Sequence, residues 1–166
     1  MRGPSGTPVG KLRRVLINNL VAHNVEPRFA SIISGIPGHR IEDVKLSNIR
    51  IIYKGGGTLA HAAVTPPEKE SNYPEPSMFG DMPAYGFFIR HADGIELSNV
   101  EIGYAKEELR PAVVIHNVNG ADFFNVDAQV SKGASAFDLQ NVRDFSATHC
   151  KGVKDTKLER VERTKL

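Results

Sequence analysis

Four acidic side chains lie close together in one stretch rich in proline and glycine. They are Glu68, Glu70, Glu75 and Asp81. Carboxylates that come in pairs can act as a general acid and a general base. Because the sequence does not fix the distance between any two of them, we favour a solvated loop over an acid–base pair.

Basic and aromatic side chains around this stretch offer a second kind of chemistry, which is binding. Arg28, His39 and Arg40 lie in or near turns, and a guanidinium can hold a carboxylate through two parallel hydrogen bonds. The simpler interpretation, which we prefer, is that they are surface turn residues. Three aromatic side chains could stack against a sugar ring or could pin the loop to the body of the protein: Tyr73, Phe79 and Tyr85.

The composition argues against several classes of function. The net charge is only +2, and the basic residues gather near the ends without interleaved aromatic residues, so we predict no nucleic-acid partner. No run of about 18 apolar residues exists, so we expect no membrane span. No His, Cys and Asp residues have the spacing of a metal site, and we predict neither a metal nor a cofactor. Cys150 is the only cysteine and residues 1–10 lack the apolar stretch of a signal peptide, which leaves the compartment open.

The elements that must position these residues are short strands that recur. A short motif of alternating apolar and polar residues, clearest at Gly94–Val100, ends at a bend and is repeated several times along the chain. These bends fall at Asn19, Asn48, Asn99, Asn125 and His149. An earlier bend of the same unit falls at His91, Asn117 and Asn141. Both series step by 26 and then 24 residues in the second half of the chain, and the step of 51 residues from Asn48 to Asn99 equals one period plus a long loop.

A period in the twenties, made of short strands and turns, is typical of a solenoid. Leucine is too sparse for leucine-rich repeats, so we predict an all-β fold, a right-handed parallel β-helix of about five coils. An antiparallel sandwich is the alternative. We disfavour it because the two bends of each unit stay the same number of residues apart in successive units. Asn suits such bends because it tolerates left-handed backbone and its amide can pair with the Asn above it. The expected inward positions include Ile95, Leu97, Val113, Ile115, Phe137 and Leu139.

The repeat divides the chain into two parts. Residues 1–152 form the coils, with residues 54–85 as one long insertion that we expect to be ordered and packed on the side of the body. Residues 153–166 are charged, and we leave open a helix or strand that caps the last coil and a frayed tail.

Several stretches resemble the bacterial branch of glycoside hydrolase family 28, the polygalacturonases and rhamnogalacturonan hydrolases. The segments that carry this resemblance are residues 2–4, 6–10, 31–39, 55–58, 66–70, 73–76 and 78–80. The resemblance covers almost the whole chain but only the C-terminal part of that family. It implies the pectin-lyase-like parallel β-helix, which agrees with the period found above.

The resemblance also implies a chemistry, the inverting hydrolysis of galacturonide or related bonds in pectin. That family carries its three acids on an Asn-x-Asp motif and an Asp-Asp pair, helped by Gly-His-Gly and Arg-x-Lys motifs. This sequence has no Asp-Asp pair, and Asn125-Val126-Asp127 coincides with a bend of the repeat, so we assign no catalytic residue. The candidate substrate-binding residues are Arg28, His39, Arg40, Tyr73 and Glu75.

Three hypotheses about function follow. The first is the C-terminal part of a secreted or periplasmic pectin hydrolase, inactive alone, whose N-terminal coils with the acids belong to the same longer polypeptide. The second is a non-catalytic β-helix module that binds acidic polysaccharide or a protein. The third is a non-functional remnant that aggregates through exposed strand edges.

Overall fold

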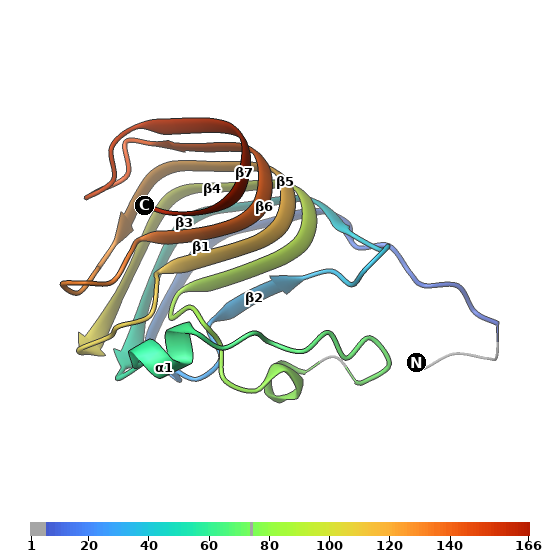
Figure 1. Ribbon diagram of the computed structural model, residues 1–166, viewed down its shortest axis with the longest axis horizontal. Coiled ribbons are helices and arrows are strands. Elements are labelled where there is room, and N and C mark those ends of the chain that lie inside the picture. The colour runs from blue at the N-terminus through green and yellow to red at the C-terminus, as the bar shows by residue number, and fades with distance from the viewer. Residues whose placement is uncertain (1–5, 74) are drawn as a thin grey trace.

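The computed structural model describes residues 6–73 and 75–166, and almost all of its regular secondary structure is strand (Figure 1). The strands are β1 (Arg13–Val25), β2 (Ser31–Ser34), β3 (Ile41–Gly55), β4 (Phe87–Lys106), β5 (Val113–Ala128), β6 (Phe137–Thr148) and β7 (Thr156–Lys165). A short helix α1 (Leu59–Ala62) and a 3₁₀ turn η1 (Pro76–Phe79) lie in the connection between β3 and β4.

All seven strands belong to one sheet with the order β1-β3-β4-β5-β6-β7, and β2 pairs with the first residues of β4. Every pair is parallel except the last, in which β7 runs antiparallel to β6. The long strands bend and nest inside one another, as Figure 1 shows. The prediction of an all-β fold with parallel strands is confirmed, and the antiparallel sandwich is excluded as the architecture of the described residues.

Left-handed backbone marks the bends that the sequence predicted. The residues of the main series have φ between 52° and 57° and lie opposite one another in the strand register: Asn19, Asn48, Asn99, Asn125 and His149. Side-chain amides connect four of them, because Nδ2 of each Asn donates to Oδ1 of the previous one at 3.4, 3.3 and 2.9 Å. The predicted amide ladder is therefore confirmed. The earlier series at His91, Asn117 and Asn141 is left-handed as well.

A third series of bends was not predicted. It consists of Arg14, Asp43, Gly94, Gly120 and Asp144, all with positive φ. Its five positions hold Arg, Asp and Gly, so no single residue type marks the series as Asn marks the main one. On each of β4, β5 and β6 only two residues separate a bend of this series from the bend of the series at His91, Asn117 and Asn141. One of the two is apolar and points into the core, as Val118 and Val142 do.

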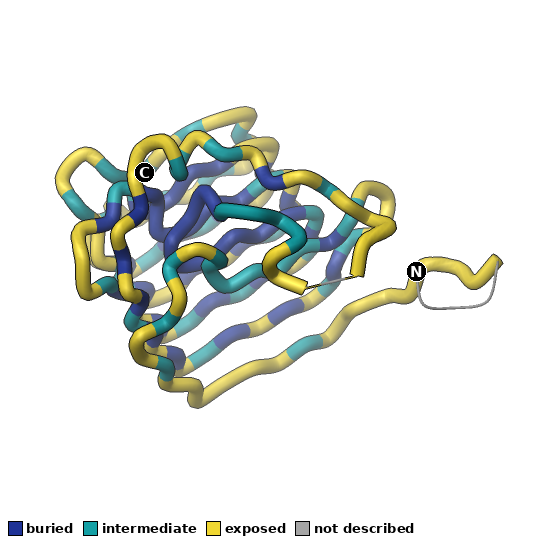
Figure 2. The backbone as a smooth tube through the Cα atoms, turned by 90° about the horizontal axis from the view of Figure 1, so that it is seen from below, coloured by how far each residue is buried: buried dark blue, intermediate teal, exposed yellow. Residues whose placement is uncertain are grey.

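The core is the inside of the bent stack. The six predicted inward residues named above are all buried, each 2 % exposed or less. Rows of aliphatic side chains continue along the stack and end in an aromatic group at the C-terminal end, where Phe123, Phe137 and Phe145 pack with ring centroids 4.9–5.8 Å apart. Figure 2 shows buried residues on the inner strands and an exposed strand at the N-terminal edge.

The long connection of residues 54–85 is ordered against the body, as predicted. Met82 and Tyr85 are buried, and Phe79 packs on Phe88 and Val114 from the outer side of β4 and β5. Tyr85 lies edge-on between Tyr53 and Tyr104, with centroids 5.8 and 5.3 Å away. Phe79 and Tyr85 therefore pin the connection to the body, whereas Tyr73 is 58 % exposed.

The C-terminal residues form a strand, which is one of the three structures that the sequence left open. The main chain of β7 pairs with β6 from Asp138 opposite Lys165 to Ala147 opposite Thr156 without a slip. Leu158 and Val161 lie against the last layer of the core. This strand covers the edge of β6 that parallel pairing would otherwise leave open.

Candidate functional site

The five predicted substrate-binding residues do not come together in one place. Arg28 pairs with Asp81 through Nε and Oδ1 at 2.6 Å and lies over the ring of Phe29. His39 is exposed in a tight turn. The Glu75 carboxylate accepts from the hydroxyl of Ser77, while Tyr73 lies on the exposed connection.

Arg40, the fifth of these residues, is held across the strands. Its Nε donates to Oδ1 of Asp93 at 2.7 Å, and its Nη2 donates to the carbonyls of Ala92 and Asn117 at 2.6 and 2.8 Å. Its Nη1 reaches Oδ1 of Asn117 at 3.2 Å. Arg40 therefore fixes one side of the Asn117 amide, and Asn117 lines the groove described next.

A polar groove of about 390 Å³ runs across the outer bends of β5, β6 and β7. Its lining consists of Asn117, Asn119, Asn141, Val142, Arg143, Arg160, Val161 and Glu162. Three amides and two guanidinium groups form most of this surface. Amides donate and accept hydrogen bonds, whereas guanidinium groups bind carboxylates, so the groove suits a polar, anionic and hydroxyl-rich ligand.

The strand register positions the polar groups of the groove. Asn119 lies opposite Arg143, and Arg143 lies opposite Arg160, so one side chain from each of β5, β6 and β7 forms a row. Neighbouring strands are about 4.8 Å apart, so the row has nearly that spacing. Gln140 opposite Arg163 extends the polar surface around the bend at Asn141.

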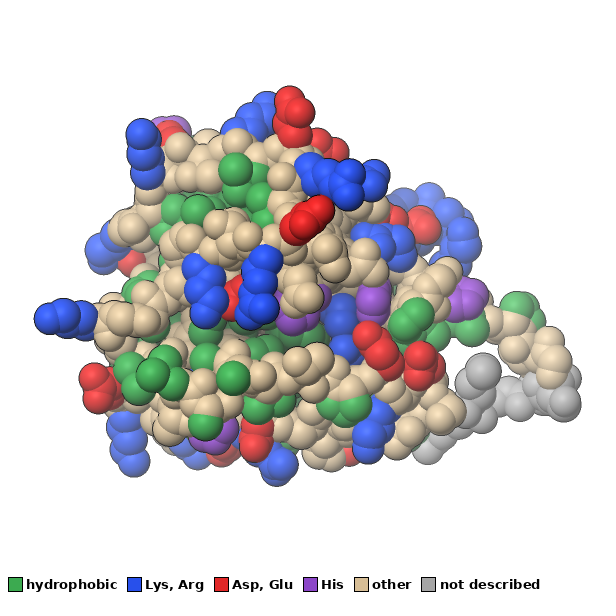
Figure 3. Space-filling view, in the orientation of Figure 1, with side chains coloured by type: hydrophobic (Ala, Val, Ile, Leu, Met, Phe, Trp, Pro, Cys, Tyr) green, Lys and Arg blue, Asp and Glu red, His purple; other side chains and the backbone are tan. Residues whose placement is uncertain are grey.

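Three arginines of this surface make no ion pair with any residue in the described ranges: Arg143, Arg160 and Arg163. Lys165 is different, because its Nζ lies 3.4 Å from Oδ2 of Asp138. The Arg-x-Lys spelling, to which we assigned no residues above, occurs at Arg163–Lys165 on β7. Figure 3 shows basic and acidic side chains interspersed across the molecule, so no single block of one sign covers this view.

The groove was missed at first because it depends on β7. Arg160 becomes a neighbour of Arg143 only when the charged tail pairs antiparallel with β6. Leu158 and Val161 are three residues apart, a spacing that does not alternate as a regular strand does and therefore did not distinguish a strand from a helix.

A second cluster of titratable groups lies where the long connection meets β4. Arg90 is 4 % exposed, and its guanidinium donates to the carbonyls of Pro66 and Pro67 at 2.9 and 3.2 Å. Glu68 Oε1 lies 3.3 Å from Nη1 of Arg90 and 3.0 Å from Nε2 of His91. Burial lowers the pKa of the Arg90 guanidinium, and the charge of Glu68 acts against that change. These contacts hold the connection in place and leave one carboxylate in the cluster, too few for an acid–base pair.

His116 lies beside this cluster on β5, edge-on to the ring of Phe88 with centroids 5.5 Å apart. Burial lowers the pKa of His116, Asp138 acts in the opposite direction, and the positive charge of Arg90 adds to the lowering. The neutral imidazole is therefore favoured at neutral pH. We assign His116 to packing rather than to ligand binding.

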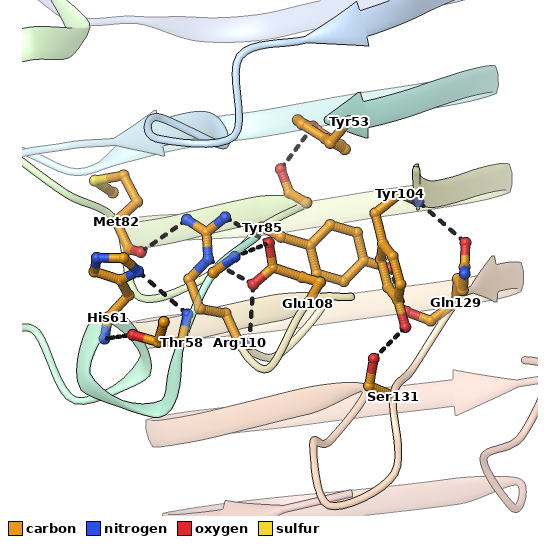
Figure 4. Close-up of polar contacts among 12 residues, drawn as sticks. Tyr53, Thr58, His61, Met82, Tyr85, Tyr104, Glu108, Arg110, Gln129 and Ser131 are labelled. Atoms are coloured by element: carbon orange, nitrogen blue, oxygen red, sulfur yellow. Dashed lines mark hydrogen bonds and ion pairs between the residues drawn. The ribbon is translucent and has the colours of Figure 1, made fainter. Parts of the chain in front are cut away.

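The third polar cluster is a fully buried ion pair (Figure 4). Glu108 accepts from Nε and Nη2 of Arg110, each at 2.8 Å, and from the backbone N–H of Gly57 at 3.0 Å. Arg110 Nη1 donates in turn to the carbonyl of Met82 at 3.2 Å. Burial on its own raises the pKa of Glu108, but the hydrogen bonds and charge of Arg110 outweigh it, so the pKa is lowered. Glu108 is 0 % exposed, and its contacts with Gly57 and Arg110 join the long connection to the body.

The remaining sequence candidate, Asn125-Val126-Asp127, is structural at both ends. Asn125 is a left-handed bend residue whose amide donates to Asn99 at 2.9 Å. Asp127 pairs with Nζ of Lys151 at 2.9 Å. Within residues 6–73 and 75–166, no three His, Cys, Asp or Glu side chains gather as a metal site requires, and no helix has the length and apolarity needed to cross a membrane.

Comparisons with protein-family models, with curated proteins and with solved structures found no match to this chain.

Proposed function

We propose that this chain is a right-handed parallel β-helix module that binds an acidic polysaccharide in the groove across β5, β6 and β7. The observation that carries the proposal is the row of amide and guanidinium groups in a groove of about 390 Å³, with Arg143 and Arg160 unpaired among the described residues. The nested parallel strands with bends in register support the β-helix.

The chemistry of a uronate polymer fits the groups in this groove. Each sugar of such a polymer carries a carboxylate and several hydroxyl groups. Arg143 and Arg160 supply planar donors for the carboxylates, and the amides of Asn119 and Asn141 supply donors and acceptors for the hydroxyls. Asn117 is oriented in advance, because Arg40 holds its Oδ1 and its Nδ2 contacts Nδ1 of His91 at 2.7 Å. Groups that are fixed before binding lose less entropy when the ligand arrives.

The groove binds without cleaving in this proposal. An inverting glycosidase places two carboxyl groups about 6.5–9.5 Å apart around the scissile bond. Glu162 is the only carboxylate among the residues that line the groove. We therefore expect purified protein to release no reducing ends from polygalacturonate above the level of a boiled sample, and turnover clearly above that level would contradict the absence of catalytic acids.

Binding is tested with oligogalacturonate by titration calorimetry. Replacing both groove arginines (Arg143→Ala/Arg160→Ala) should weaken binding at least tenfold, because each charge-assisted hydrogen bond contributes about 1.5–3 kcal/mol. The matched control removes two exposed lysines outside the groove, Lys132→Ala/Lys154→Ala, and has the same net charge. Circular dichroism verifies that both variants are folded.

Three outcomes would refute the proposal. They are no binding of oligogalacturonate, an equal loss of affinity in both double variants, and equal binding of fully methyl-esterified pectin, which lacks the carboxylates. An equal loss in both variants would mean that net charge alone attracts the polymer.

A second candidate function is a part of a pectin-degrading hydrolase of glycoside hydrolase family 28, with its acids elsewhere in a longer polypeptide. The parallel pairing of β1, β3, β4, β5 and β6 supports it, since that family's fold requires such strands. In that case a longer polypeptide with additional N-terminal strands would hydrolyse polygalacturonate, and the groove would belong to the substrate cleft. Hydrolysis that persists in the Arg143→Ala/Arg160→Ala variant of such a polypeptide would separate the groove from the cleft.

A further inference from the structure

The edge strand β1 leaves one side of its backbone without a strand partner among the described residues. Its other side pairs with β3 from Arg13 to Val25. Large apolar side chains are exposed along it: Leu12 56 %, Leu16 67 %, Ile17 43 %, Leu20 37 % and Val21 67 %. An open edge of this length that carries exposed apolar residues is a surface for pairing with another strand.

Below this edge lies an apolar cavity of about 490 Å³. The inward side chains of β1 form one wall, and those of β3, with part of β2 and η1, form the rest. Val44, Leu46 and Ile49 on β3 are buried, yet Ile17 and Leu20, which lie opposite Leu46 and Ile49, stay 43 % and 37 % exposed. The apolar stack is therefore incomplete by one layer at this end.

The spacing of the inward residues along β1, counted from the residue just before it, reads the same in both directions. They are Leu12, Val15, Ile17, Leu20, Ala22 and Val25, at steps of 3, 2, 3, 2 and 3 residues. Because this spacing is symmetric, the strand can pair antiparallel with a second copy of itself so that every inward side chain lies opposite another inward side chain.

We propose that β1 pairs antiparallel with β1 of a second copy of this chain and forms a closed two-fold dimer. The register places Ile17 opposite Leu20, Val15 opposite Ala22, and Leu12 opposite Val25, each pair occurring twice. On the outer face it places Leu16 opposite Val21, the two most exposed apolar side chains of the strand. An isologous contact of this kind closes on itself, so it uses both β1 edges and offers neither of them to a third copy.

Charge and hydrogen bonding agree with this register. Lys11 precedes the strand and Glu26 follows it, and the register sets these opposite charges opposite each other, beside the pairs that they make within the chain with Glu42 at 4.0 Å and Lys54 at 3.6 Å. Asn19 accepts from Asn48 at 3.4 Å and is the end of the amide ladder. Its Nδ2 donor then meets Asn18 of the second copy, which continues the ladder by one contact.

The opposite end of the molecule demonstrates that antiparallel pairing is compatible with these bends. There β7 runs antiparallel to β6, although β6 has left-handed residues at Asn141 and Asp144 and β7 has none. The register of that pair does not slip, and Val142 lies opposite Val161 and Phe145 opposite Leu158. The same geometry at β1 buries the incomplete apolar layer.

The first experiment measures mass by sedimentation equilibrium over a range of concentrations. The purified chain should be a dimer, and Ile17→Lys should weaken the dimer at least a hundredfold, because it sets two charges in the apolar contact. Leu59→Lys is the matched control, since Leu59 is 64 % exposed on α1 and should leave the dimer intact. A chain that stays monomeric, an open-ended series of oligomers, or an equal effect of both substitutions would overturn the proposal.

The second experiment tests the register by disulfide formation. Directly opposed residues of antiparallel strands have Cα atoms about 4.5–5.5 Å apart, which suits a disulfide. The variant Leu16→Cys/Val21→Cys should therefore form a covalent dimer under mild oxidation. Leu16→Cys alone should not, because the two copies of residue 16 are five positions apart, about 17 Å. Cross-linking by the single variant, or none by the double variant, would refute this register, and wild-type protein controls for Cys150, which is buried.

Discussion

Replacing Glu108 with alanine is expected to destabilise the fold by about 4 kcal/mol, within the range for breaking a buried ion pair. Glu108 is 0 % and Arg110 is 3 % exposed, so water does not screen the pair. The carboxylate accepts from Gly57 N at 3.0 Å and from Arg110 N, Nε and Nη2 at 3.1, 2.8 and 2.8 Å. Its removal leaves these donors and a buried positive charge unpaired, and such a loss is a large share of the about 5–15 kcal/mol of a typical domain.

Urea denaturation followed by circular dichroism measures this loss. With an m-value of about 2 kcal/mol/M, the midpoint should fall by about 2 M urea. The control is Glu101→Ala, which breaks the Arg50–Glu101 pair; both of those side chains are about half exposed, so the loss should stay below about 1 kcal/mol. The double variant Glu108→Leu/Arg110→Leu should be more stable than Glu108→Ala, because it leaves no unpaired charge.

Two results would refute the reasoning. One is a loss for Glu108→Ala no larger than that for Glu101→Ala, and the other is a double variant that is no more stable than Glu108→Ala. The sign of the pH dependence gives an independent test with the Glu108→Gln variant. Because the pKa of Glu108 is lowered in the folded state, its contribution is present above its unfolded pKa of about 4.3 and disappears as the pH falls through the folded pKa. The stability difference between wild type and Glu108→Gln should therefore narrow below about pH 4.3.

Other parts of the structure give further predictions. Gly57→Ala should destabilise the protein by about 2 kcal/mol in urea melts, because an added Cβ would overlap the carboxylate of Glu108, whereas Gly10→Ala, whose added Cβ would meet no atom within 4 Å, should change it by less than about 0.5 kcal/mol. Asn99→Ala should cost about 2 kcal/mol, as it removes two ladder contacts and leaves alanine at a φ of 54°, while Asn99→Gly should cost less because glycine adopts that φ freely. Burial raises the pKa of Tyr53 to about 12, so its contribution to stability is present below about pH 10 and is lost as the pH rises through 12; absorbance at 295 nm should show tyrosine that ionises only near pH 12, and complete tyrosine ionisation by about pH 11 would contradict the burial of Tyr53.

Much of the fold could be predicted from residue types that recur at regular intervals. Asn is almost alone among residues with a Cβ in adopting left-handed backbone readily, so its return at Asn48, Asn99 and Asn125 located one series of bends and the strand register with it. The alternation around those bends also identified the inward side chains, such as Leu97 and Ile115. These features can be read from short stretches of sequence compared with one another, without knowledge of any contact between them.

The candidate site was harder to predict because it depends on contacts between distant segments. Arg143 and Arg160 are 17 residues apart and become neighbours only through the antiparallel pairing of β7. Glu108 and Arg110 are two residues apart in the segment between β4 and β5, and the charged residues of that segment gave no sign that the pair is buried. Arg28 and Glu75 looked like binding residues but contact Asp81 and Ser77, respectively. In each case the role of the side chain depends on the residue that the fold brings next to it, and that neighbour cannot be identified from the sequence alone.

The antiparallel last strand has a consequence for how the chain folds. The parallel pairs join residues far apart along the chain: Arg13 and Glu42 are 29 residues apart, Val44 and Ile95 are 51 apart, and Val113 and Phe137 are 24 apart. In the last pair, Ala147 and Thr156 are nine residues apart. Contacts of large sequence separation form slowly, because the loop must close before any contact is gained.

The β6–β7 ribbon is therefore the one part of the sheet that can form from neighbouring residues. We expect it to act as the template on which β5, β4 and β3 are added in turn, with β1 last. Pulsed hydrogen exchange during refolding should find amides of β6 and β7 protected first and those of β1 last, and early protection of β1 would exclude this order. The direction of assembly would then run opposite to the direction of synthesis, so the strands from β1 to β5 would wait for β6 and β7 before the core could close.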